Sequence, residues 1–151
     1  MIEGVKKKEL KVIPDERGRL MEILRDDDGF FERFGQVYTT TVYPGVVKAW
    51  HYHEQQTDNV VCIHGMIKLV LCDWRKESKT CRQIMEIFMV EHNPLLVQIP
   101  PMVLHGWKGM GEKESIVVNI PNRHYEYDKP DELRLPYDSL EVGYDWSIKF
   151  H

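Results

Sequence analysis

A series of short segments rich in β-branched residues, punctuated by Gly, Pro and Asp, constrains the fold of this chain more than any other feature. Val, Ile and Thr favour strands, and the punctuating residues favour reversals of the chain. The roughly even spacing of the segments predicts an all-β fold, either an antiparallel sandwich or a barrel. The expected strands are residues 19–25, 35–43, 46–53, 59–65, 66–74, 84–90, 95–101 and 115–121.

The segments between the expected strands add little regular structure. A helical turn or two is expected at residues 29–35, where three phenylalanines fall on one face of a helix. The charged segment 128–139 contains two prolines and is expected to be an ordered surface excursion. Because the chain has 151 residues and no linker, repeat or low-complexity segment, we expect residues 1–151 to form a single domain.

Charge and hydropathy exclude several classes of partner. The net charge is −4 and the longest basic block is Lys6–Lys8, so we expect no binding to nucleic acid. No apolar run approaches the roughly 20 residues of a membrane span, and the first residues lack the apolar core of a signal peptide. The three cysteines have no zinc-site spacing and are expected to be free thiols. These features predict a cytoplasmic protein without a membrane partner.

The segment 36–41 is polar on both faces of a strand. Alternation places Gln36, Tyr38 and Thr40 on one face and Val37, Thr39 and Thr41 on the other. Such a strand is either an edge strand wetted on one side or a strand that lines a hydrated cavity inside a barrel.

Residues 45–65 hold a histidine pair and an acid at defined spacing. His51 and His53 are two residues apart, so on a strand they project to the same side, and Asp58 follows a polar bend. The pattern Gly45-x5-His51-x-His53-x4-Asp58-x6-Gly65 resembles the first motif of the cupin superfamily, with Asp in place of the usual Glu. Pro100 and His105 resemble part of the second motif. The resemblance implies a cupin-type antiparallel β-barrel or jelly roll, with the three histidines facing a cavity.

Five segments, in the same order along the chain, resemble a narrower family. They are similar to motifs of the dTDP-4-dehydrorhamnose 3,5-epimerases: D-x-R-G-x-F-x-E, the Q-x-N-x-S strand with R-G-L-H-Y-Q, D-x-R-x-x-S-x-T, P-x-G-x-A-H-G-F, and the closing Y-x-P-E…D-P region. The matching segments are residues 13–25, 34–53, 71–80, 99–107 and 124–139.

This resemblance implies an isomerase, namely an epimerase of a nucleotide-linked 4-keto-6-deoxyhexose. Such an enzyme removes the α-proton beside the ketone, in deoxysugar and cell-surface polysaccharide biosynthesis. The resemblance also implies a homodimer that pairs through exchanged strands, a nucleotide-sugar substrate, and no cofactor or bound metal.

Carried over residue by residue, the resemblance places His51 on the family's catalytic base. Three residues fall on positions that hold the nucleotide and its pyrophosphate, and Arg17 suits that role because guanidinium pairs bidentately with phosphate oxygens. Lys48 stands where the family has a substrate-contacting arginine, and His105 matches the second pocket histidine. Tyr125 and Tyr127 lie near the family's second pocket tyrosine, and either could supply an acid. The expected substrate-binding residues are Arg17, Glu22, Gln36, Tyr38, Lys48, His105 and Tyr125.

Three of the family's four chemical partners are missing or changed. One is the carboxylate that orients the base, which the resemblance places beyond His151. Asp58 replaces a lysine, and a buried-type residue, Val118, falls near the position of the tyrosine that reprotonates the far face of the sugar. We expect His51, His53 and Asp58 to be catalytic, with Asp58 orienting one of the two histidines. A metal bound by these residues and His105 is the alternative, and it would exclude His51 as a free base.

Three other activities remain open on the sequence alone. Paired histidines at this point of the barrel also resemble sugar-nucleotide 3,4-ketoisomerases, which move a ketone along the ring from one face. A metal-dependent cupin enzyme and a non-catalytic sugar-nucleotide-binding cupin are the other two alternatives.

Overall fold

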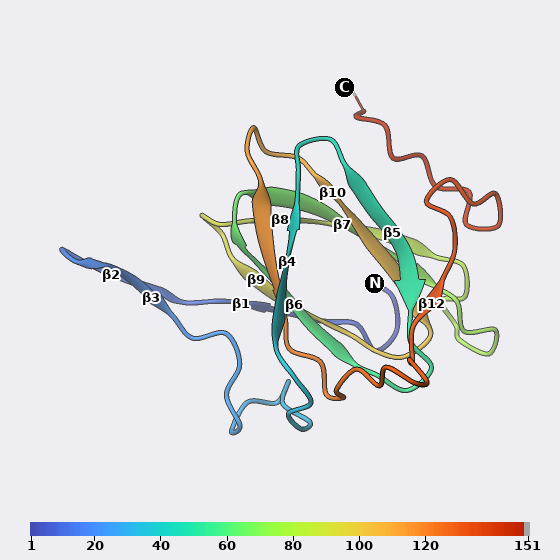
Figure 1. Cartoon of the computed structure of the whole chain (residues 1–151), viewed down its shortest axis with the longest axis horizontal. Helices are drawn as coiled ribbons and strands as arrows, with labels where there is room; N and C mark the ends of the chain where they lie inside the picture. Colours follow the sequence, from blue (N-terminus) through green and yellow to red (C-terminus); the bar gives the residue numbers. More distant parts are fainter. Residues whose placement is uncertain (150–151) are drawn as a thin grey trace.

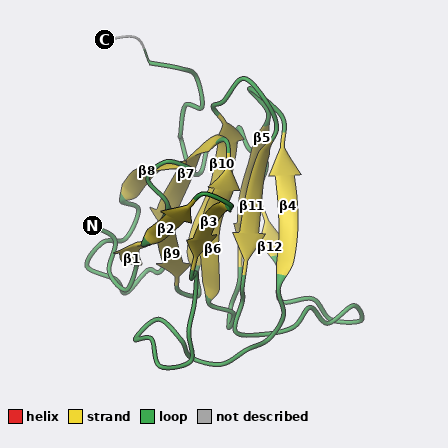
Figure 2. Ribbon diagram, turned by 90° about the vertical axis from the view of Figure 1, so that its left-hand side faces the viewer, coloured by secondary structure: helices red, strands yellow, loops and turns green. Residues whose placement is uncertain are grey.

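The computed structural model describes residues 1–149 as two five-stranded sheets and a two-stranded hairpin, with every strand pair antiparallel. The two sheets lie face to face, as the side view in Figure 2 shows. The antiparallel all-β fold predicted from the sequence is therefore confirmed. No helix that is long and apolar enough to cross a membrane occurs within residues 1–149.

The first sheet has the order β1-β9-β6-β11-β4, so its neighbours in space are mostly distant in sequence. Its edge strand β4 is the polar segment identified above. The members are β1 (Lys6–Glu9), β9 (Leu95–Ile99), β6 (Asp58–His64), β11 (Ser115–Asn119) and β4 (Tyr38–Val42).

The second sheet has the order β12-β5-β10-β7-β8. Gly65 makes the tight turn from β6 into this sheet, because its φ of +75° is accessible to glycine at little cost. The members are β12 (Leu133–Arg134), β5 (Val47–Tyr52), β10 (Val103–Gly109), β7 (Met66–Asp73) and β8 (Ile84–Val90).

The core lies between the two sheets. Buried aliphatic residues of β6, β9 and β11 pack against those of β7, β8 and β10, and most of them are fully inaccessible to solvent. Each such side chain contributes about 1.5–3 kcal/mol on burial. This apolar packing fills one part of the space between the sheets and leaves the polar face of β4 free to line the other.

A separate hairpin projects from the sandwich. It consists of β2 (Val12–Asp15) and β3 (Gly18–Met21), and Figure 1 shows it extending away from both sheets. Its apolar residues Ile13 and Leu20 are 47% and 57% exposed. The hairpin therefore carries an apolar surface that the rest of the described chain does not cover.

The expected strands are found, most of them with shifted or shorter ends, but the helical turn expected at residues 29–35 is wrong. Residues 29–35 form turns and extended chain, in which the N–H of Gly35 bonds to the carbonyl of Pro121. Phe30 packs beside a buried cluster of the first sheet while Phe34 is 64% exposed. The phenylalanines therefore do not share a buried face. Long-range backbone bonding has replaced the local bonding that a helix needs.

Candidate active site

A cavity of about 690 Å³ lies between the two sheets, a volume typical of small-molecule sites. The first sheet contributes residues from β4 and the segment before it, and the second contributes residues from β5, β10 and β12. The principal polar residues of the wall are Gln36, Tyr38, Thr40, Lys48, His51, His53, Gln56, Tyr125, Glu132 and Arg134. Both interpretations of the polar strand are thus correct, because β4 is an edge strand and also lines the cavity.

His51 lies on β5 and faces this cavity. Its ring packs against two residues of β10, with centroid distances of 4.0 Å to His105 and 5.6 Å to Trp107. Burial, with a smaller electrostatic contribution from the neighbouring His105, holds the pKa of His51 well below 6.5 although Asp58 opposes the shift. His51 is therefore neutral at pH 7 and keeps a nitrogen lone pair that can accept a proton.

His53 differs from His51 because both of its ring nitrogens have partners. The Nδ1–H donates to the backbone carbonyl of Asp131, and Nε2 lies 3.3 Å from Oδ2 of Asp58. Burial alone would lower the pKa of His53, but Asp58 and, to a smaller extent, Asp131 together outweigh it and raise the pKa to about 9. His53 is therefore an imidazolium at neutral pH.

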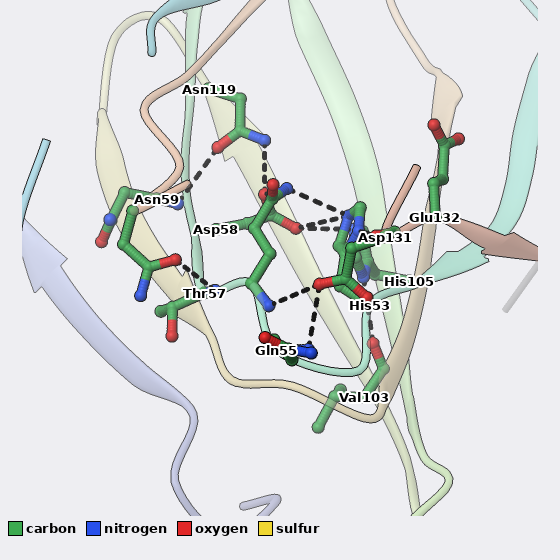
Figure 3. A network of polar contacts seen from close by, with 12 residues as sticks. His53, Gln55, Thr57, Asp58, Asn59, Val103, His105, Asn119, Asp131 and Glu132 are labelled. Carbon is green, nitrogen blue, oxygen red and sulfur yellow. Dashed lines mark hydrogen bonds and ion pairs between the residues drawn. The ribbon is translucent and has the colours of Figure 1, made fainter. Parts of the chain in front are cut away.

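Asp58, at the start of β6, is the centre of a buried polar network (Figure 3). It is 1% exposed, and its Oδ1 accepts hydrogen bonds from Gln56 at 2.9 Å and from Asn119 at 2.8 Å. Burial alone would raise its pKa, but His105 and His53 hold the pKa well below 3.8. The carboxylate is therefore ionised, with Oδ1 hydrogen-bonded to two amide groups.

The network decides which histidines Asp58 orients. Its Oδ2 lies 3.3 Å from Nε2 of His53 and also 3.3 Å from Nε2 of His105, and both contacts are within ion-pair range but outside hydrogen-bond geometry. The other nitrogen of His105, Nδ1, bonds to the carbonyl of Val103 at 3.0 Å. Asp58 thus pairs with His53 and His105, whereas His51 has no direct contact with it among the described interactions.

Three of the four residues considered above as metal ligands converge. Nitrogen atoms of His53 and His105 and an oxygen of Asp58 lie within 4.8 Å of one another, a grouping that could hold a divalent ion. His51 is outside this group. A metal held by His53, Asp58 and His105 would therefore leave His51 free to act as a base.

The C-terminal segment contributes residues that the sequence analysis did not anticipate. The carboxylate of Asp131 accepts the backbone N–H groups of residues 54, 55 and 56 at 2.8–3.0 Å and so fixes the bend between His53 and Asp58. Strand β12 pairs with β5, placing Arg134 opposite His51, and Glu132 joins the cavity wall. The segment is ordered, as predicted, but it is part of the site rather than only a surface excursion.

Strand β10, which carries His105, was also missed, because prolines and glycines surround it. Its glycines serve close packing, since a Cβ on Gly106 would lie 2.3 Å from the Cβ of Ala49. An irregularity in the β10–β5 register sits between His105 and Trp107. The only signal in the sequence was the Pro-x4-His motif itself.

Gln36, Lys48 and Tyr125, three of the expected substrate-binding residues, do line the cavity. Gln36 accepts the backbone N–H of Tyr125 at 3.2 Å, and the Nζ of Lys48 donates to Oγ1 of Thr40 at 3.1 Å. These contacts tie the first sheet, the second sheet and the segment after β11 together around the cavity.

Arg17 and Glu22 do not line this cavity, so their expected role in holding the nucleotide and its pyrophosphate stays a prediction. Arg17 sits at the tip of the β2–β3 hairpin, with its side chain 85% exposed and paired with Asp15. Glu22 follows the hairpin and pairs with Arg25 on the surface. The spacing of the sequence could not reveal this, because the hairpin leaves the sandwich to which its flanking strands belong.

Comparison with known proteins gives a consistent result. The sequence model of the family described as dTDP-4-dehydrorhamnose 3,5-epimerase matches residues 1–151. The spore coat polysaccharide biosynthesis protein SpsL of Bacillus subtilis is 41% identical over 150 residues, which cover 99% of each chain. The probable low-salt glycan biosynthesis epimerase Agl13 of Haloferax volcanii is 38% identical, over 99% of this chain and 97% of that one. The crystal structure of a dTDP sugar isomerase from Desulfovibrio desulfuricans G20 superposes with a TM-score of 0.91 at 31% identity, covering 96% of this chain and 92% of that one.

Proposed function

This chain belongs to the dTDP-4-dehydrorhamnose 3,5-epimerase family, and on that basis we propose that it epimerises a nucleotide-linked 4-keto-6-deoxyhexose with His51 as the proton-abstracting base. The resemblance drawn from the five sequence segments is confirmed, as is the assignment to the sugar-nucleotide epimerases, which are isomerases. The identity of the nucleotide and sugar, and the roles of individual residues, are our proposals.

The observation that carries the assignment of the base is the contrast between the two histidines of the pair. His51 faces the cavity and is held neutral, so it can take a proton from the carbon beside a ketone. His53 is protonated, and both of its nitrogens are engaged by Asp58 and by a backbone carbonyl. His53 therefore cannot act as the base without breaking the buried network.

Removing the α-proton creates an enolate, and stabilisation of its negative charge usually contributes more to the rate than any other single effect. Three cationic side chains line the cavity near the base. They are Lys48, three residues before His51 on β5, the imidazolium of His53, and Arg134, which pairs opposite His51 on β12. They supply the positive charge that the family's lysine would give at position 58. Asp58 is paired with His53 and His105, so its charge is compensated and does not repel the enolate.

Because both ring nitrogens of His53 are engaged, the ketoisomerase alternative is less favoured. Moving a proton between neighbouring carbons on one face requires a histidine that can both give and accept it. His51 is the one free histidine of the pair, and the cavity has a second wall, formed by β4, on the opposite sheet. This two-walled arrangement favours epimerisation, in which the proton returns from the other face.

The test is deuterium uptake from heavy water by a dTDP-linked 4-keto-6-deoxyhexose, followed by mass spectrometry. We expect His51→Asn to slow exchange about 10²- to 10⁴-fold, the usual contribution of a general base. His92→Asn is the matched control, because the side chain of His92 is 79% exposed on the surface and should leave exchange unchanged. Exchange at the wild-type rate in His51→Asn would contradict the assignment.

Metal dependence is tested in the same assay. We expect the wild-type enzyme to exchange deuterium at the same rate after incubation with a chelator, because amide donors and the imidazolium of His53 already pair with Asp58. Loss of exchange with EDTA and recovery with zinc or manganese would instead identify the His53, Asp58 and His105 group as a metal centre.

We propose a homodimer in which the β2–β3 hairpin of one subunit reaches the cavity of the other. Support comes from the projection of the hairpin in Figure 1, its exposed Ile13 and Leu20, and the fact that Arg17 does not line the cavity of its own subunit. A mixture of Arg17→Ala and His51→Asn dimers, after subunit exchange, should regain activity that neither variant has alone. A monomer mass in light scattering at micromolar concentration would refute the proposal.

A cytoplasmic location fits this substrate and the thiols. Cys62, Cys72 and Cys81 are free, and the first two are buried. Free thiols persist in a reducing compartment.

A further inference from the structure

Epimerisation at a carbon beside a ketone needs a second proton-transferring group. The base removes the proton from one face, and inversion requires that a new proton arrive at the opposite face. His51 stands on the β5 wall of the cavity, so the complementary group belongs on the wall formed by the other sheet. Val118, near which the family's tyrosine falls, cannot serve, because a valine side chain has no acidic proton; it packs instead with Val61 and Leu96.

Tyr38 occupies that opposite wall. It lies on β4, the edge strand of the first sheet, and lines the same cavity as His51 of the second sheet. Its cross-strand partner in the β11–β4 register is Asn119, whose Nδ2 donates to the phenolic oxygen at 2.9 Å. Asn119 is 2% exposed, so the hydroxyl is anchored from the core side.

We propose that Tyr38 is the acid that delivers the proton to the face of the sugar opposite His51, an assignment that rests on the proposed function. The direction of the Asn119 hydrogen bond is central. Because the amide donates to the phenolic oxygen, the hydroxyl hydrogen is not used in that bond and stays available for transfer to a substrate carbon.

The charge environment keeps this acid protonated. Burial, followed by the negative charge of Asp58, raises the pKa of Tyr38 to about 12. The hydroxyl therefore carries its proton throughout the physiological range. When that proton leaves, the Asn119 amide stays hydrogen-bonded to the phenolate oxygen and limits the cost of its charge.

Asn119 also links the acid to the buried carboxylate. Its Nδ2 donates to Oδ1 of Asp58 at 2.8 Å as well as to Tyr38, and its Oδ1 accepts the backbone N–H of Asn59 at 3.1 Å. In Figure 3, dashed lines join Asn119 to Asn59 and to Asp58. We assign Asn119 as a positioning residue. It fixes the phenol of Tyr38 relative to Asp58, which in turn pairs with His53 beside the opposite wall.

Tyr125 and Tyr127 are the competing acids, and the structure disfavours both. They pack on each other with ring centroids 5.2 Å apart, and their residues are 40% and 89% exposed. Neither is anchored by a hydrogen bond of its hydroxyl among the described interactions. An acid must be held at the reacting carbon, and only Tyr38 of the three has that support.

The proton balance of the step is closed. His51 takes the proton as the substrate C–H bond breaks and the enolate forms. The phenolic O–H of Tyr38 then breaks, and its proton forms the new C–H bond from the other face as the ketone is restored. The imidazolium and the phenolate return to their resting states by proton exchange with water in the open cavity.

The test separates exchange from inversion in one experiment. Tyr38→Phe is incubated in heavy water with a dTDP-linked 4-keto-6-deoxyhexose, and the recovered substrate and product are analysed by mass spectrometry and NMR. We expect His51 to keep exchanging the α-proton with retention, within a few-fold of the wild-type rate. Net inversion is expected to fall about 10²- to 10⁴-fold. Tyr125→Phe is the rival variant, and Tyr43→Phe is the inert control because Tyr43 is 66% exposed outside the cavity wall.

Each outcome is decisive. Deuterated substrate without inverted product in Tyr38→Phe supports the proposal. Wild-type inversion in Tyr38→Phe, the same uncoupling in Tyr125→Phe alone, or an equal loss of exchange and inversion in Tyr38→Phe overturns it, the last indicating a structural role. Absence of exchange in the wild-type enzyme would instead contradict the proposed function itself.

Discussion

Replacing Asp58 with Asn is expected to destabilise the protein by removing the partner of a buried imidazolium. In the wild-type protein the pKa of His53 is about 9 instead of 6.5. At about 1.4 kcal/mol per pKa unit, this corresponds to about 3 kcal/mol of folding free energy. The low pKa of Asp58 reports the same interaction, so it is not added to this figure.

The pH dependence gives the prediction its sign. Because the folded-state pKa of His53 is raised, the stabilisation is complete below pH 6.5 and is lost as the pH rises through about 9. We therefore expect the wild-type protein to exceed Asp58→Asn by about 3 kcal/mol at pH 6. The two proteins should converge near pH 10, where His53 is neutral in both.

The assay is urea unfolding of both proteins at several pH values, with an NMR titration of the histidine rings. The titration should show the pKa of His53 falling from about 9 to below 6.5 in the variant, since burial alone lowers it. Asp15→Asn is the control, because Asp15 pairs with Arg17 on the exposed hairpin and its loss should leave the unfolding midpoint unchanged. A stability difference that is equal at pH 6 and pH 10, or that grows with pH, would refute the ion pair.

Three other contacts of the fold carry predictions of their own. As the pH falls, kcat/KM should begin to drop only below pH 6.5, because burial lowers the pKa of His51. A drop centred at or above pH 6.5 would show that His51 is not the base. Asp73→Asn should speed proteolytic cleavage in residues 74–83, because the buried carboxylate binds the guanidinium of Arg75 and two hydroxyls of that loop; unchanged cleavage kinetics would deny it this role. Gly106→Ala should lower Tm by several degrees, because the new Cβ would lie 2.3 Å from the Cβ of Ala49. An unchanged Tm would mean that β5 and β10 can move apart at this point without loss of stability.

The sequence by itself determined the features that depend on local pattern. Period-two alternation and turn residues were enough to find most strands of both sheets. The two-residue spacing also predicted that His51, on β5, and His53, just after its end, face the same cavity. The polar alternation of β4 likewise predicted a cavity wall. These inferences succeeded because side-chain direction on a strand is decided by the strand itself.

The tertiary structure decided everything that depends on partners distant in the chain. Asp131 meets His53 across 78 residues and Asn119 meets Asp58 across 61, and no local signal marks either partner. Residues 29–35 form no helix, because Gly35 bonds instead to the distant Pro121. Arg17 does not line the cavity, because its hairpin extends away from the two sheets.

The division of labour between the two histidines shows the difference most clearly. On the sequence they are equivalent, since both belong to one strand and one motif. In the folded protein, His51 packs against the ring of His105 without a carboxylate partner, while His53 meets Asp58 and the carbonyl of Asp131. One is therefore held neutral and the other charged, because the balance between desolvation and ion pairing is set by which atoms the fold brings within a few ångströms of each ring.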